Sequence, residues 1–152
     1  MAAQNGHVAV VRLLHEAGAD SSRAKEDGTR PLFVAAQHGH LEVVEFLCAI
    51  GADRHEPNRC GATPLLAASQ KGHLEVVQYI CGGGAAEGEV GCASIEVPLP
   101  DGCTPLIAAS RFGHTAVCQA LLAHGASRTS AVRGNAVIGS NGTAAEVARS
   151  SG

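Results

Sequence analysis

A 33-residue internal repeat constrains the fold of this sequence more than any other feature. The dipeptide Gly-His starts at residues 6, 39, 72 and 113, and Pro-Leu starts at residues 31, 64 and 105. Both series share a period of 33 residues, which lengthens to 41 at the last step. Self-similarity at this period is typical of proteins that stack small similar units, each of which buries its apolar side only against its neighbours.

Composition limits how these units can pack. The 152-residue chain has 19 Gly, three Phe, one Tyr and no Trp, although 45 % of its residues are hydrophobic. A core built on large aromatic side chains is therefore excluded, and the units must pack closely through small side chains.

Each unit is predicted to contain two short helices. Thr63 and Thr104 each precede a proline, which is the arrangement of an N-cap followed by proline at the first helical position. The helix that starts there is expected to end at the glycine of the next Gly-His pair. A second helix with one buried side is predicted by apolar residues that recur at i, i+1 and i+4: Val10, Val43, Val76 and Val117; Val11, Val44, Val77 and Cys118; Leu14, Leu47, Ile80 and Leu121.

These motifs resemble those of ankyrin repeats, whose signature includes Thr-Pro-Leu-His-x-Ala at a 33-residue period. The resemblance is carried by segments 27–53, 60–86 and 101–127 and extends over nearly the whole chain. It implies an all-α fold, an ankyrin-repeat solenoid of stacked helix-turn-helix layers with projecting turns or hairpins.

The sequence departs from the family pattern at one polar position in each repeat. Phe33, Leu66 and Ile107 stand where the family has His, and Arg30 stands where the first full repeat should have Thr. The polar contact that the His normally makes near the Thr is therefore expected to be absent. Apolar contacts should carry more of the layer packing instead.

We expect one domain over residues 1–152, divided at the repeat boundaries. It comprises a partial repeat (1–26), a full repeat (27–59), two repeats with insertions (60–100 and 101–139) and a final partial repeat (140–152). The first insertion, within 82–100, is predicted to be mobile or a small hairpin with extended segments at 90–92 and 94–97.

The N-terminal edge is predicted to be unfinished. Ala2 and Ala3 are all that the sequence retains of a first helix, so the apolar residues Val10, Val11 and Leu14 should lack a polar cap. Self-association through this edge, or an upstream segment that covers it, is expected.

Charge and the N-terminal sequence exclude some classes of protein. Eleven Lys and Arg against 14 Asp and Glu give a net charge of −3, which is not the signature of a nucleic-acid-binding chain. The N-terminus has no basic region, and Arg12 interrupts its apolar stretch, so neither a signal peptide nor a membrane anchor is predicted. We expect an intracellular protein, cytoplasmic or nuclear.

The histidines and cysteines do not predict a metal or cofactor site. His7, His40, His73 and His114 form a column, but neighbouring layers are ~8–10 Å apart, too far for ligands that each approach Zn²⁺ within ~2.0–2.3 Å. These histidines are predicted to connect adjacent loops. The same spacing excludes a disulfide between Cys48 and Cys81, two residues of one column.

The six cysteines are divided by their place in the repeat. Cys48, Cys81 and Cys118 are predicted to be small buried residues, because they lie in or beside the apolar columns. Cys60, Cys92 and Cys103 lie at turn tips or in the insertion and are expected to be more exposed. Any redox chemistry would then begin at these three cysteines.

No catalytic motif appears, so an enzyme is not expected. The favoured hypothesis is a non-enzymatic module that binds a protein partner on the concave face formed by turn tips and first helices. The alternative is a regulatory or targeting fragment of a larger multidomain enzyme or channel. The same residues are also compatible with a merely solvated face, but the aromatic Phe112 favours binding. The predicted partner-binding residues are Gln37, His38, Arg59, Ala62, Gln70, Lys71, Cys103, Arg111 and Phe112.

Overall fold

The computed structural model describes residues 1–82 and 92–128. This part of the chain forms seven α-helices and no strand. The helices are α1 (Val8–Glu16), α2 (Pro31–His38), α3 (Leu41–Ala49), α4 (Pro64–Lys71), α5 (Leu74–Cys81), α6 (Pro105–Arg111) and α7 (Thr115–Ala123).

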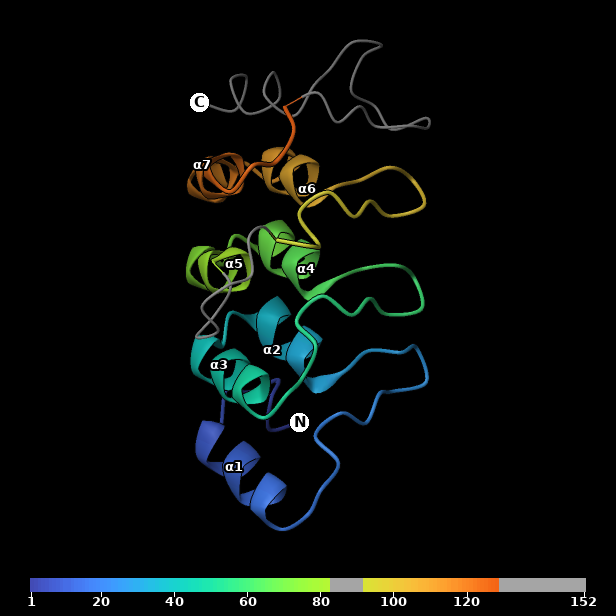
Figure 1. Ribbon diagram of the computed structural model, residues 1–152, viewed down its shortest axis with the longest axis vertical. Helices are drawn as coiled ribbons and strands as arrows, with labels where there is room; N and C mark the ends of the chain where they lie inside the picture. The colour runs from blue at the N-terminus through green and yellow to red at the C-terminus, as the bar shows by residue number, and fades with distance from the viewer. Residues whose placement is uncertain (83–91, 129–152) are drawn as a thin grey trace.

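The helices are arranged in two parallel rows, as predicted for a solenoid. The first helices of the repeats, α2, α4 and α6, pack on one another, and the second helices α1, α3, α5 and α7 stack beside them. Each pair α2/α3, α4/α5 and α6/α7 forms one layer, while α1 packs on α3. The connecting turns all project to the same side of the stack (Figure 1).

Local sequence explains where the first helices begin and end. The Oγ1 atom of Thr63 accepts a hydrogen bond from the backbone N–H of Leu66 at 3.2 Å, and Thr104 caps α6 in the same way. Proline follows each cap at the first helical position. Gly39 and Gly72 then close α2 and α4 in the left-handed conformation, with φ of 77° and 79°.

The core is continuous through the layers and consists of small and branched side chains. Ala35, Ala68 and Ala109 of the first helices are completely buried, which lets these helices approach closely. Ile107, which stands where the family has His, is only 1 % exposed, and Phe33 and Leu66 at the matching positions are also buried. Apolar packing therefore occupies the position of the family's polar contact.

The repeated Gly-His pair connects one layer to the next. The Nε2 atom of His73 donates to the backbone carbonyl of Gln37 at 3.1 Å, and His40 and His114 bond equivalently to the preceding layer. A Cβ atom on Gly39 would lie 2.5 Å from Nδ1 of His73, so only glycine leaves room for the ring. The predicted role of these histidines in connecting adjacent repeats is confirmed for His40, His73 and His114.

The segment after the first insertion corrects a prediction from the sequence. Residues 94–97 are not extended: they form a turn in which Ile95 N–H bonds to Cys92 O at 3.0 Å and Val97 N–H bonds to Ser94 O at 3.3 Å. Ser94 lies 41 residues after Asp53, which is the spacing that the Gly-His and Pro-Leu pairs also show at this step, so this segment follows the register of the ordinary repeat turn. Residues 83–91, 129–139 and the last partial repeat lie outside the described residues.

The burial of two cysteines also differs from the prediction. Cys92 and Cys103 are buried, at 6 % and 7 % exposure, whereas Cys60 is exposed as predicted. Cys103 immediately precedes the N-cap of α6, a position that lies inside the turn; the matching Thr29 is likewise buried. Cys81 and Cys118 are buried as expected, and Cys48 is intermediate.

Candidate functional site

The ends of the first helices form the main exposed row of predicted binding residues. We call this surface the helix-end row, and it comprises Gln37 and His38 of α2, Gln70 and Lys71 of α4, and Arg111 with Phe112 at the end of α6. All except the half-buried Gln37 are exposed. Because α2, α4 and α6 pack in order, the row is continuous across three layers.

The aromatic residue of the row is held in place by the histidine that follows it. Phe112 is 57 % exposed, and its ring stacks on His114 with the ring centroids 6.4 Å apart and an interplanar angle of 21°. His38 repeats this arrangement on His40, with centroids 6.2 Å apart. Lys71 occupies the matching position between them. Two exposed rings of the row, those of His38 and Phe112, thus each lie against the ring of a following histidine.

The turns supply a second group of predicted residues, and one of these is not exposed as the sequence had led us to expect. Arg59 is exposed, Ala62 is half-buried and Cys103 is buried, so Cys103 presents no side chain to a partner. The Arg59 N–H bonds to the Asp27 carbonyl of the preceding turn at 3.1 Å. This bond joins neighbouring turn tips to each other.

Acidic side chains at the start of the turns fix their shape. The Oδ1 atom of Asp27 accepts from the Thr29 N–H at 2.8 Å, and Asp101 accepts from the Cys103 N–H at 2.9 Å. The bond from the Thr29 backbone holds the pKa of Asp27 below its ordinary value. Each turn is thus braced by its own side chain.

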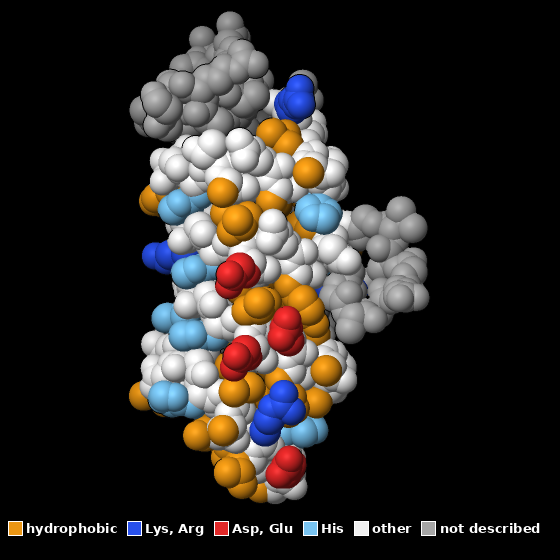
Figure 2. All heavy atoms as spheres, turned by 90° about the vertical axis from the view of Figure 1, so that its left-hand side faces the viewer, with side chains coloured by type: hydrophobic (Ala, Val, Ile, Leu, Met, Phe, Trp, Pro, Cys, Tyr) orange, Lys and Arg blue, Asp and Glu red, His pale blue; other side chains and the backbone are white. Residues whose placement is uncertain are grey.

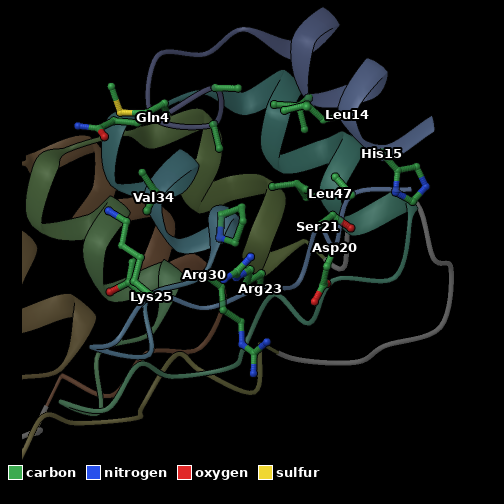
Figure 3. Close-up of a pocket in the computed structure, with 17 residues that line it drawn as sticks. Gln4, Leu14, His15, Asp20, Ser21, Arg23, Lys25, Arg30, Val34 and Leu47 are labelled. Carbon is green, nitrogen blue, oxygen red and sulfur yellow. The ribbon is translucent and has the colours of Figure 1, made fainter. Parts of the chain in front are cut away.

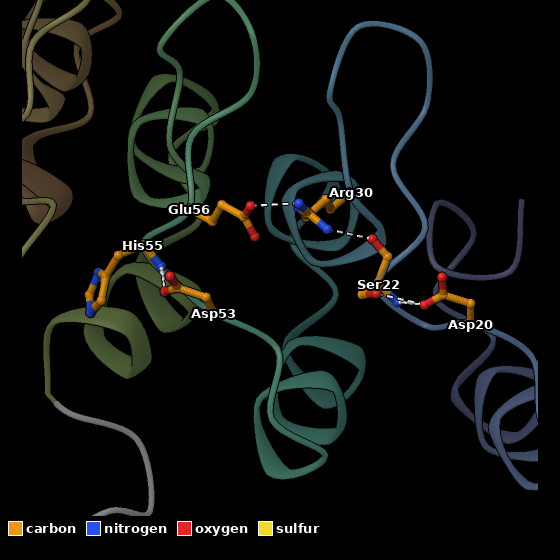
Figure 4. Close-up of polar contacts among 6 residues, drawn as sticks. All are labelled: Asp20, Ser22, Arg30, Asp53, His55 and Glu56. Carbon is orange, nitrogen blue, oxygen red and sulfur yellow. Dashed lines mark hydrogen bonds and ion pairs between the residues drawn. The ribbon is translucent and has the colours of Figure 1, made fainter.

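Arg30 makes contacts that the sequence pattern did not foretell. Its guanidinium donates to Glu56 at 2.5 Å and to the Ser22 carbonyl at 2.7 Å, and so links turns of two repeats (Figure 4). Asp20 in turn accepts from the N–H and hydroxyl of Ser22, which lowers the pKa of Asp20. The presence of Arg in the Thr column was the available signal for this network.

A pocket of about 260 Å³ lies at the N-terminal edge of the stack. Leu14, Val34 and Leu47, from α1, α2 and α3, form part of its apolar wall, and Arg23 and Lys25 lie at its polar side (Figure 3). Residues 1–6 form turns beside it rather than a helix. Val10 and Leu14 are exposed as predicted, but Val11 is buried, so the edge is only partly open. Self-association through this edge stays a prediction.

The face formed by the second helices differs in charge from the helix-end row. Glu42, Glu45 and Glu75 are exposed on α3 and α5. Figure 2 shows acidic side chains gathered on this face and histidines lined along one of its edges. In contrast, the helix-end row carries Lys71 and Arg111.

The fold and its interlayer contacts define a helical repeat solenoid. The family model for ankyrin repeats matches residues 1–58 and 50–132, with three copies. This chain therefore belongs to the ankyrin repeat family. None of the curated proteins compared with it matches.

Family membership gives the general class of function. Ankyrin repeats are generally protein–protein interaction modules, and the family is typically non-enzymatic. In residues 1–82 and 92–128, every helix is too short or too polar to cross a bilayer.

Proposed function

We propose that this chain binds a protein partner on the concave face formed by its turn tips and first helices, with the helix-end row at the centre. The observation that carries the proposal is the ring of Phe112, which is 57 % exposed and stacks on the ring of His114. Ordering an aromatic ring before binding reduces the entropic cost of the complex. Aromatic and Arg side chains are also the residues that most often dominate binding energy.

The charges around this ring indicate what the partner should present. Arg111 is the sequence neighbour of Phe112, and two further exposed basic residues belong to the preceding repeat: Lys71 ends α4, and Arg59 lies in the turn before α4. A partner segment with an apolar side chain between carboxylates would fit this surface. The same segment would be repelled by Glu42 and Glu75 on the second helices, which favours one face over the other.

Calorimetry with an isolated partner tests this proposal. The partner would be captured from a lysate with the wild-type chain and then titrated against variants. We expect Phe112→Ala to weaken binding by about 2 kcal/mol or more, roughly thirtyfold in Kd. Arg111→Ala and Lys71→Ala should weaken it by smaller factors, because each removes one charge from the row.

Substitutions on the opposite face serve as matched controls. Glu42→Ala and Glu75→Ala also truncate exposed helical side chains and should leave Kd unchanged. The proposal is contradicted if the three row variants bind as the wild type does while either Glu variant abolishes binding.

A further inference from the structure

A polar pocket of about 280 Å³ lies on the concave face, between the turns and the end of α2. Lys25 and Asp27 line it from the turn before α2, and Asn58 lines it from the following turn. Gln37 and His38 line it from α2 and also belong to the helix-end row. We call it the concave pocket, and it adjoins the surface proposed to bind the partner.

The amide of Asn58 is held in one orientation by its own turn. Its Oδ1 atom accepts hydrogen bonds from the backbone N–H groups of Cys60 and Ala62, both at 3.0 Å. Because a carboxamide has one oxygen and one NH2 group, the Nδ2 donors of Asn58 are the part left for a ligand. From this side the pocket therefore offers a hydrogen-bond donor.

The ring of His38 is also fixed, and one of its nitrogens is left to take up a proton. Nδ1 of His38 lies 2.9 Å from the carbonyl oxygen of Val34, which can only accept, so Nδ1 carries the proton of the neutral ring. Nε2 then has the lone pair, on an exposed side chain. The stacked ring of His40 differs: its Nε2 bonds to the Gln4 carbonyl, and its Nδ1 lies against Gly6, where a Cβ atom would be only 2.5 Å away.

The charges that line the concave pocket balance when His38 is neutral. Lys25 supplies one positive charge and Asp27 one negative charge. The hydrogen bond from the Thr29 backbone holds the pKa of Asp27 below its ordinary value, and Lys25 acts in the same direction, so this carboxylate stays ionised. Histidine side chains change charge between about pH 5 and 8. Protonation of His38 therefore gives the pocket a net positive charge.

The charged groups on the neighbouring elements do not alter this balance. Arg59, beside Asn58 in the chain, and Lys71 of α4 are basic, whereas Glu26, beside Asp27, and Glu42 of α3 are acidic. All four are exposed, and none of them lines the pocket. The charge state of His38 thus decides the sign of the pocket.

We propose that the concave pocket binds a carboxylate side chain of the partner, and that protonation of His38 strengthens this binding. The inference rests on the proposed function, since it places one acidic residue of the partner. Nζ of Lys25, Nδ2 of Asn58 and the protonated Nε2 of His38 would donate to the two carboxylate oxygens, and such charge-assisted hydrogen bonds are the stronger kind. At higher pH, the lone pair of Nε2 replaces one of these donors.

The distance between the pocket and Phe112 constrains the partner further. His38 ends α2 and Phe112 follows α6, and α4 packs between these two helices. Packed helices are ~8–10 Å apart, so two steps along the row cover about 16–20 Å. An extended segment advances about 3.3 Å per residue and spans this distance with about five or six residues. A partner that reaches both sites would carry an acidic residue and an apolar residue at that spacing.

An NMR titration with a small carboxylate tests the pocket without the partner. The probe is N-acetylglutamate amide, and N-acetylglutamine amide is its neutral control of the same shape. Amide spectra of the 15N-labelled chain would be recorded at about pH 6 and about pH 8, which bracket the change of charge of most histidines. We expect the glutamate probe to shift amides at 25–29, 37–39 and 57–60. Its affinity should be about threefold to tenfold higher at the lower pH.

Variants assign the effect to single side chains. His38→Gln keeps a polar side chain that cannot titrate, so it should remove the pH dependence of probe binding. Lys25→Gln should weaken binding at both pH values. His124→Gln removes an exposed histidine at the end of α7 and should bind the probe as the wild type does. The amide spectra themselves report whether each variant remains folded.

The outcomes separate this inference from the proposed function. It is overturned if both probes shift the pocket amides equally at the lower pH, or if the pH dependence persists in His38→Gln. Phe112→Ala should leave the titration with the glutamate probe unchanged, because its ring lies two layers away. Loss of probe binding in Phe112→Ala would contradict a separate pocket, whereas the calorimetry of Phe112→Ala with the partner tests the proposed function alone.

Discussion

The N-terminal edge and the centre of the solenoid contain the same sequence columns but bury them differently. Leu14 of α1 is 49 % exposed, whereas Leu47 of α3 and Ile80 of α5, in the same column, are 0 % and 1 % exposed. Among the second helices, α1 packs against a single neighbour, α3, whereas α3 packs against both α1 and α5. In this fold, burial comes from the adjacent layer and cannot be assigned to a residue by its column.

The largest expected effect compares these two leucines. Leu47→Ala should lower the free energy of unfolding by about 2–4 kcal/mol, because it leaves a cavity in a fully buried site. Leu14→Ala removes the same atoms from a half-exposed site and should cost less than about 1 kcal/mol. Urea unfolding of both variants checks the difference. Equal losses of unfolding free energy would show that the N-terminal edge and the centre of the solenoid do not differ in packing at this column.

A second comparison concerns two glycines that share a left-handed backbone. Gly39 and Gly51 have φ of 77° and 93°, but only at Gly39 would a Cβ strike the next layer, at His73. Gly39→Ala should therefore cost about 1–3 kcal/mol more than Gly51→Ala in chemical denaturation. Adding His73→Ala to Gly39→Ala should recover part of that extra loss. No recovery would mean that the ring is not the obstacle.

The smallest effects are expected where the caps of the first helices differ. Thr63→Ala should cost about 1 kcal/mol, because α4 loses its side-chain cap. α2 has no such cap. Arg30→Thr would remove the half-exposed ion pair with Glu56 but supply a side-chain cap, so we expect the free energy of unfolding to change by less than about 1 kcal/mol. Thermal unfolding distinguishes the two. A larger loss for Arg30→Thr would show that its bridge between turns matters more than capping.

The sequence predicted the repeat well because each marker has a local physical role. Threonine before proline predicted the caps of α4 and α6, and the Gly-His pairs predicted the interlayer contacts of His40, His73 and His114. The solenoid and the exposed part of the helix-end row followed from these markers.

Features that depend on where an insertion ends could not be predicted. The sequence left the extra residues anywhere within 82–100, so Cys92 could not be aligned with the repeat, and its burial was missed. The burial of Cys103 was missed because the position before the N-cap lies inside the turn, which the residue type does not reveal. The Arg30–Glu56 pair also joins two turns that are far apart in sequence.

Hydrogen exchange in the presence of the isolated partner tests the binding surface most directly. We expect slower exchange of amides at 37–39, 70–72 and 111–113, where the first helices end, and little change at 42–49 and 75–81 in the second helices. The pocket at the N-terminal edge provides the competing outcome. Protection confined to residues 1–4 and 19–30, with the three helix ends unchanged, would contradict the proposed surface and place the partner at that edge.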